Sequence, residues 1–143
     1  MIEIKNIREV KSTDGYDEVW AIVRSMKSQT SWIKQVPELS PSEDLFFKYL
    51  SLKRRGEWGE DAFANIYLPQ FLKEMQDNEA KKKLAYLFDA DKTGKRIALL
   101  CFCPEEKLCH RSIIAGLLQG AGAEVKAQAN YGRYFSLWKE AGK

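Results

Sequence analysis

The sequence predicts an α/β protein, a single three-layer domain over residues 1–143 in which helices flank a small, mostly parallel sheet. Residues 97–103 form an apolar run, which is typical of a strand covered on both faces. From His110 onward the apolar residues recur at the spacing of one buried helix stripe. The short connection between the two favours a helix that starts beside the carboxyl end of the strand, where open α/β sheets place their ligand sites.

The remaining strands are predicted from weaker patterns. Residues 1–10 alternate as an opening strand with one wetter face, and residues 18–24 form a more apolar and more central strand after a turn at 12–15. Residues 29–39 have no clean period, so we expect a loop over the sheet edge. Residues 123–129 alternate like an edge strand.

Three helical segments separate the second strand from the apolar one. Ser40 is the expected cap of the first helix, with Pro41 in its first position. Pro69 is expected to kink or split the second helix, and residues 77–78 offer a cap for the third. After a turn at residues 130–132, a terminal helix or lid that carries Tyr134, Phe135 and Trp138 is expected. The buried stripe of the first helix is predicted to be Leu45, Phe46, Tyr49 and Leu50.

Composition excludes several classes of protein. Hydrophobic residues make up 45% and charged residues 30%, which is typical of a soluble globular chain and argues against wholesale disorder. The net charge of +3 makes no strong case for a nucleic-acid partner, and the basic runs at 53–55 and 81–83 are expected to be solvated faces. No apolar run is long enough to span a membrane. With three cysteines and an N-terminus that lacks a signal-peptide core, we expect a cytoplasmic protein with free thiols and no membrane partner.

The chemistry is concentrated at one strand-to-helix junction. The three cysteines and the single histidine lie within ten consecutive residues, and Arg111 and Ser112 follow directly. A helix N-terminus attracts anions, so a cation such as Arg111 costs about 0.3–1 kcal/mol there unless a negative group neutralises it. Arg24, at the end of the strand over residues 18–24, is expected at the same sheet edge. We therefore predict that Arg111, Ser112, Arg24 and Cys103 bind a small anionic ligand or a nucleotide phosphate.

Other interpretations of this junction stay open. Glu105 or Glu106 can fold back onto Arg111 in place of a bound anion. Alternatively, the chain is a cysteine-dependent enzyme in which Cys109 is the activated thiol and His110 assists it. Adjacent helical residues point about 100° apart, so those two side chains need not touch. Whether the chain is an enzyme, its oligomeric state and the identity of its ligand are left undecided.

A metal or redox site is the weaker alternative. Cys101, Cys103, Cys109 and His110 are suitable zinc ligands, but the usual pair of cysteines on one turn is missing. In a continuing strand, Cys101 and Cys103 would have their Cα atoms roughly 6.5–7 Å apart on one face, which is awkward for chelation. A redox pair of Cys103 with Cys109 is a further option. We assign no metal and no cofactor from the sequence.

The segment LLCFCPEEKLCHRSIIAGLL resembles the signature of the bacterial family called domain of unknown function 488 (DUF488), in which a Leu-Leu-Cys strand is followed eight residues later by Cys-His-Arg. WIKQVPELSPSEDLFFKY and YLPQFLKEM look like its shorter YeaO-like branch. Many relatives carry an acid two residues after the first cysteine, where this chain has Cys103. The resemblance implies an α/β fold and a shared site but no particular reaction. The matching residues are Leu99, Leu100, Cys101, Cys109, His110 and Arg111.

Overall fold

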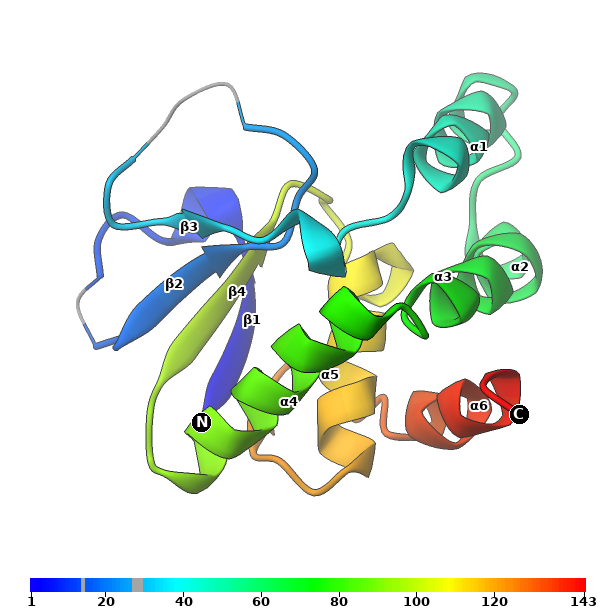
Figure 1. Cartoon of the computed structure of the whole chain (residues 1–143). Helices are drawn as coiled ribbons and strands as arrows, with labels where there is room; N and C mark the ends of the chain where they lie inside the picture. The colour runs from blue at the N-terminus through cyan, green and yellow to red at the C-terminus, as the bar shows by residue number, and fades with distance from the viewer. Residues whose placement is uncertain (14, 27–29) are drawn as a thin grey trace.

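A computed structural model describes residues 1–13, 15–26 and 30–143, so Asp14 of the predicted turn and Gln29 of the predicted loop lie outside the described residues. Its centre is a parallel sheet with the strand order β3-β2-β4-β1-β5 (Figure 1). This confirms the predicted α/β class. The strands are β1 (Ile2–Asn6), β2 (Glu18–Ala21), β3 (Lys34–Gln35), β4 (Ile97–Cys101) and β5 (Val125–Lys126).

The α-helices lie to one side of this sheet (Figure 1). They are α1 (Glu43–Arg54), α2 (Glu60–Ala62), α3 (Leu68–Glu74), α4 (Asn78–Lys92), α5 (His110–Gly120) and α6 (Arg133–Ala141). Shorter helical turns are η1 (Ile7–Glu9), η2 (Pro37–Leu39), η3 (Phe63–Tyr67) and η4 (Glu106–Leu108). The opposite face of the sheet is covered by residues from η1 and from the connecting segments around Tyr16 and Trp32.

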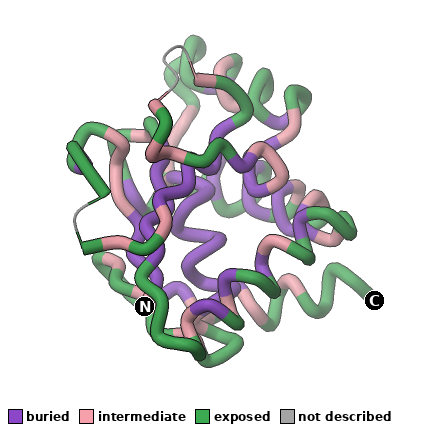
Figure 2. The backbone as a smooth tube through the Cα atoms, turned by 60° about the vertical axis from the view of Figure 1, so that its left-hand side comes forward, coloured by how far each residue is buried: buried purple, intermediate pink, exposed green. Residues whose placement is uncertain are grey.

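Strand β4 and helix α5 form the centre of the core (Figure 2). Every residue of β4 is buried, because the strand pairs with β1 on one side and β2 on the other. Alternate residues of β4 belong to two hydrophobic clusters on opposite faces of the sheet. Leu99 and Cys101 pack with the helices, whereas Ala98 and Leu100 pack with η1 and the connecting segments. Residues 110–118 of α5 are also buried, since this helix lies between the sheet and the outer helices.

Helix α1 differs from its prediction in start and in orientation. Its cap is Ser42, whose Oγ accepts a hydrogen bond from the Leu45 backbone N–H at 3.2 Å, so the helix begins two residues later than expected. Its buried side chains are Leu45 and Leu52, whereas Phe46 is 44% exposed. The predicted stripe was therefore wrong at Phe46, because that side of α1 faces a pocket and not the core.

Other connections also depart from the expected pattern. The predicted loop over residues 29–39 contains β3, which pairs with β2, and η2. The helical stretch around Pro69 is divided as predicted, since the π-helical segment η3 ends directly before α3 and Pro69 lies in the first turn of α3. Strand β5 is confined to Val125–Lys126 at the sheet edge, and the terminal helix is present as α6.

The register brings three strand ends together. Asn6 of β1 lies opposite Cys101 of β4, and Ala21 of β2 lies opposite Leu100. The segments that follow these strands therefore meet at one edge, where α5 also begins. Among the described residues, none of the helices combines the length and the apolar character needed to cross a bilayer.

Candidate functional site

The three cysteines and the histidine form one compact cluster, which we call the thiol–imidazole cluster: Cys101, Cys103, Cys109 and His110. One donor atom from each side chain lies within 4.8 Å of the other three. The Sγ of Cys101 is 3.6 Å from that of Cys103 and 3.3 Å from that of Cys109. Strand β4 ends at Cys101, so Cys103 lies in the following loop and its sulfur turns back toward the strand end.

His110 is held in one orientation by the sheet. Its Nε2–H donates a hydrogen bond to the carbonyl oxygen of Ile22 at 2.7 Å, which leaves Nδ1 directed at the cysteines. Nδ1 lies 3.7 Å from the sulfur of Cys101 and 3.7 Å from that of Cys109. The 100° separation expected for adjacent helical residues does not apply, because Cys109 is the N-cap and has an extended backbone, with φ −118° and ψ 148°.

The pKa values of two thiols in the cluster, those of Cys101 and Cys109, are shifted in opposite directions. Hydrogen bonding with Cys103 and with Cys109 lowers the pKa of the Cys101 thiol, against the effect of burial. Burial raises the pKa of the Cys109 thiol well above its usual value. Burial also acts to lower the pKa of His110, but the negative charge of Cys101 outweighs it and raises that pKa to about 10. Negative charge is therefore favoured on Cys101, whereas the sequence pointed to Cys109 as the activated thiol.

Arg111 lies beside the cluster, is almost completely buried, and forms no ion pair with a carboxylate among the described residues. Its side chain is buried, and Nη1 donates a hydrogen bond to the carbonyl oxygen of Cys103 at 2.9 Å. The same nitrogen is 3.9 Å from the Sγ of Cys109, and Nε has no hydrogen-bond partner in the described part of the chain.

The predicted alternative for Arg111, an acid folded back onto it, does not form as an ion pair among the described residues. Glu106 instead accepts hydrogen bonds from the Tyr131 hydroxyl at 2.7 Å and from the Gln128 backbone N–H at 2.9 Å. Arg111 and Glu106 both line a separate cavity of about 210 Å³ beside β1. The Arg111 guanidinium therefore lies near the Cys109 sulfur, at 3.9 Å, and forms no ion pair with a described carboxylate.

Ser112 stabilises the first turn of α5. Its hydroxyl is fully buried and donates a hydrogen bond to the carbonyl oxygen of Cys109 at 2.8 Å. This bond closes the first turn of α5 and holds Cys109 at the helix start. The structure therefore does not bring Ser112 into the same cavity as Arg24 and Cys103.

A cavity of about 490 Å³, which we call the edge pocket, opens at the carboxyl ends of β2 and β4. Arg24, Cys103 and His110 all line it, so the structure brings these three predicted site residues together. The Nε of Arg24 donates a hydrogen bond to the Pro41 carbonyl oxygen at 3.0 Å, which anchors this arginine to the segment that precedes α1. Cys101 also lines the pocket.

Several residues of this region were not found from the sequence. The aromatic wall of the edge pocket comes largely from α1 and η3, and it comprises Phe46, Phe47, Tyr49, Tyr67 and Phe102. Glu43 lines the same pocket. Asn6, at the end of β1, donates a hydrogen bond from Nδ2 to the Cys103 carbonyl oxygen at 2.9 Å. A polar residue at the end of the neighbouring parallel strand was the only available signal for this contact.

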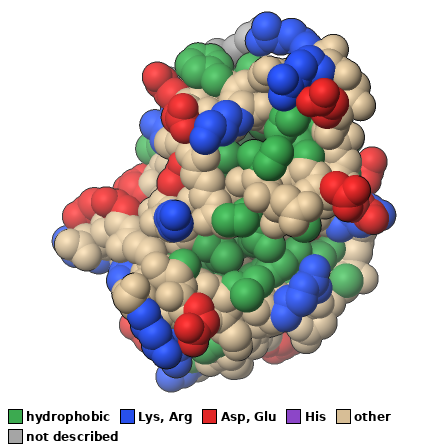
Figure 3. Space-filling model, turned by 90° about the vertical axis from the view of Figure 1, so that its right-hand side faces the viewer, with side chains coloured by type: hydrophobic (Ala, Val, Ile, Leu, Met, Phe, Trp, Pro, Cys, Tyr) green, Lys and Arg blue, Asp and Glu red, His purple; other side chains and the backbone are tan. Residues whose placement is uncertain are grey.

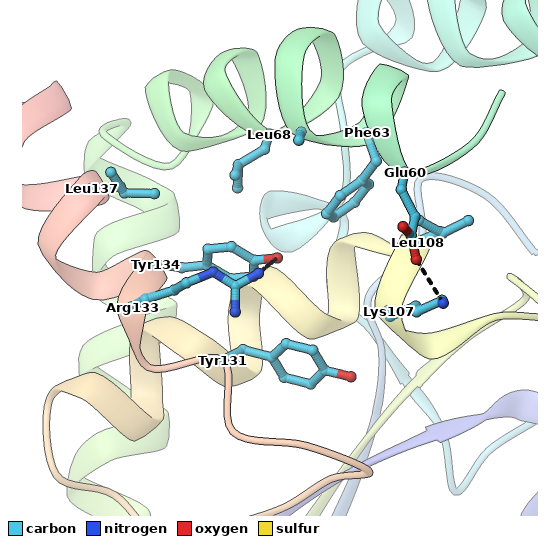
Figure 4. A pocket seen from close by; sticks show the side chains of 10 residues that line it. Glu60, Phe63, Leu68, Lys107, Leu108, Tyr131, Arg133, Tyr134 and Leu137 are labelled. Atoms are coloured by element: carbon cyan, nitrogen blue, oxygen red, sulfur yellow. Dashed lines mark hydrogen bonds and ion pairs between the residues drawn. The ribbon is translucent and has the colours of Figure 1, made fainter. Parts of the chain in front are cut away.

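A third cavity of about 370 Å³ lies on the other side of Leu108, lined by residues of η3, α3, η4 and α6 (Figure 4). The Lys107–Glu60 ion pair, at 2.8 Å, closes one end of it, and the Arg133 guanidinium lies over the Tyr134 ring. Hydrophobic side chains gather on this side of the molecule, bordered by charged ones (Figure 3). None of the site residues predicted from the sequence lines this cavity.

Fold and site together define an α/β protein with a buried thiol–imidazole cluster at the carboxyl edge of a parallel sheet. Residues 5–122 match a family model described as DUF488-N3a, the active DUF488-N3 subclade. The chain therefore belongs to the DUF488 family. No curated protein and no solved structure matches the chain significantly.

Proposed function

We propose that the edge pocket binds a small anionic ligand that carries a phosphate and a planar ring, as a nucleotide does. The observation that carries this proposal is the position of Arg24 in a pocket of about 490 Å³ that also borders the first residue of α5. A guanidinium and a helix N-terminus are the two groups that proteins most often present to phosphates. The cavity has the size of a small-molecule site.

The charges of the pocket support one phosphate position. Arg24 makes no ion pair within the described ranges, and its Nε is committed to the Pro41 carbonyl oxygen. Arg24 also lines the edge pocket, so its guanidinium is available to an anion there. Glu43 is the opposing charge among the lining residues. The phosphate is therefore expected beside Arg24 and away from Glu43.

The aromatic wall supports the second half of the ligand. Phe46 and Phe47 are large hydrophobic side chains that are 44% and 61% exposed, which is unusual unless a partner or ligand covers them. Tyr49 lies across the same wall and contacts the Tyr67 ring edge-on, at 6.4 Å between ring centroids. Such rings offer stacking surfaces for a base or another flat group.

Isothermal titration of the full chain with AMP, adenosine and inorganic phosphate tests this proposal. We expect AMP to bind more tightly than either fragment, and Arg24→Ala to weaken AMP binding about tenfold or more. Glu43→Gln should strengthen it by removing the opposing charge. Arg54→Ala, which removes an exposed arginine from the far end of α1, is the matched control and should change nothing. Equal affinities for AMP and adenosine, or an unchanged affinity in Arg24→Ala, would contradict the phosphate position.

The second candidate is a cysteine-dependent enzyme that acts on the ligand of this pocket. Two observations favour it: Cys101 and Cys103 line the pocket, and the matched subclade is described as active. Cys109, the thiol expected from the sequence, is buried and is not among the lining residues. If a thiol acts on a bound molecule, Cys103 is the accessible one, because it is only partly buried.

Alkylation mapping tests this assignment. With iodoacetamide at neutral pH, the metal-free, reduced chain should be modified first at Cys103, because the other two thiols are enclosed. Peptide mass spectrometry over a time course measures the order. A faster reaction at Cys109 would support the thiol expected from the sequence in its place.

A further inference from the structure

We propose that the thiol–imidazole cluster is a metal site, in which Cys101, Cys103, Cys109 and His110 together hold one tetrahedral ion of the zinc class. The proposal does not depend on the ligand of the edge pocket. It rests on the arrangement of the four donor atoms, on the orientation of the imidazole and on the position of one buried arginine.

The spacing of the donor atoms matches a tetrahedral site. An ion with Zn–S bonds of about 2.3 Å and a Zn–N bond of about 2.0 Å places two sulfurs roughly 3.8 Å apart, and a sulfur and a nitrogen roughly 3.5 Å apart. The two sulfur–sulfur distances from Cys101 are 3.6 and 3.3 Å. The two distances from the His110 Nδ1 to sulfur are both 3.7 Å. The two remaining pairs both involve Cys103 and lie within 4.8 Å, so the Cys103 sulfur must move inward by up to about 1 Å to share the ion.

The second nitrogen of His110 has the environment of a metal ligand. Metal-binding histidines usually donate their other ring N–H to a carbonyl or carboxylate, which fixes the tautomer and aims the free nitrogen at the ion. His110 does this with the Ile22 carbonyl oxygen, at 2.7 Å. A disulfide between two of the cysteines would not involve the His110 Nδ1, which points at the sulfurs. A metal ion would bind all four side chains.

Arg111 supplies independent evidence for negative charge in the cluster. A guanidinium that is only 3% exposed requires a compensating charge. Glu106 lines the same cavity, but no described carboxylate forms an ion pair with Arg111. Its Nε has no hydrogen-bond partner in the described part of the chain, and its Nη1 lies 3.9 Å from the Cys109 sulfur. Three thiolates around a divalent ion carry one net negative charge, which a single adjacent arginine balances.

The backbone that carries the three cysteines is held in place by the strand, the helix and hydrogen bonds of the loop. Cys101 ends a central strand and Cys109 caps a buried helix, so both sulfurs come from rigid elements. The loop between them is tied down at the Cys103 carbonyl oxygen, which accepts hydrogen bonds from Asn6 and from Arg111, both at 2.9 Å. Cys103 is the least enclosed of the three cysteines, which makes it the ligand to vary without disturbing the core.

Cobalt and zinc binding by the full chain test the proposal. The protein is stripped with a chelator under a phosphine reductant, its free thiols are counted, and Co²⁺ is added under exclusion of oxygen. We expect one ion per chain with strong thiolate-to-cobalt charge-transfer absorption, displaced by one equivalent of Zn²⁺. Zinc should also raise the melting temperature.

Two variants of the same loop sharpen the result. Cys103→Ser removes one of three sulfurs, so the charge-transfer intensity per bound cobalt should fall by about one third and zinc affinity about 100-fold or more. Glu105→Ser changes an exposed residue of the same loop that lies outside both the edge pocket and the cluster, and it should match the wild type. Circular dichroism verifies that both variants are folded. A wild-type chain with three free thiols that binds no cobalt, cobalt bound without thiolate absorption, or a Cys103→Ser variant equal to the wild type would each overturn the metal site.

Arg24→Ala separates this proposal from the pocket ligand. It should bind cobalt and zinc like the wild type, because Arg24 contributes no donor atom to the cluster. Loss of AMP binding with retained metal binding then leaves the metal site standing. Retained AMP binding in a chain that takes up no metal refutes the metal site alone.

Discussion

Single residues in this protein owe their position to charge as much as to packing. Arg111 is buried at the start of a helix, where the helix dipole disfavours a cation, and among the described residues it has no acidic partner. Its favourable contacts are the Cys103 carbonyl oxygen and the Cys109 sulfur. This explains why an arginine persists at a position that a cation would normally avoid: it bridges the loop and the thiols.

Arg111→Ala should therefore lower the free energy of unfolding by about 2–4 kcal/mol, because it removes a buried charge partner and leaves the Cys103 carbonyl oxygen without that donor. Denaturant unfolding measures the change. Lys107→Ala, which breaks an exposed ion pair with Glu60, is the control and should leave the free energy of unfolding nearly unchanged. Equal losses in the two variants would show that Arg111 has no special role.

At the scale of elements, the contact between α5 and α6 depends on two glycines that the sequence did not mark as packing positions. A Cβ at Gly116 would lie 2.2 Å from the Tyr131 carbonyl oxygen, and one at Gly120 would lie 2.2 Å from the Phe135 Cβ. Gly120 was interpreted only as a helix stop, and α5 does end there. An isolated glycine inside a helical pattern does not reveal which neighbour approaches it.

Gly116→Ala should consequently reduce stability by about 1–3 kcal/mol or more, since the backbone of the next segment must move. The melting temperature of the purified variant reports the effect. Gly59→Ala provides the comparison, because a Cβ there meets nothing within 4 Å, and it should stay within about 0.5 kcal/mol of the wild type. If both variants melt alike, α5 and α6 are not packed as closely as described.

At the scale of the whole molecule, the sequence was sufficient for the class of fold and for the place of the site. Buried apolar runs predict parallel strands, and parallel strands end at one edge, so Arg24 and Cys103 were expected there and both line the edge pocket. The convergence of the three sulfurs was not predictable from spacing, because β4 ends at Cys101 and the chain then turns. The aromatic wall of the edge pocket was also not predicted, because most of it comes from α1 and η3, which are distant in sequence from the cysteines.

The most direct test of the claim that this strand-to-helix junction is the functional centre is an anomalous-difference map. Crystals of the chain loaded with one equivalent of Zn²⁺ would be measured on both sides of the zinc absorption edge. The predicted result is a single strong peak surrounded by the sulfurs of Cys101, Cys103 and Cys109 and by the Nδ1 of His110. A peak bound only to surface carboxylates, with no density among the sulfurs, would contradict the claim.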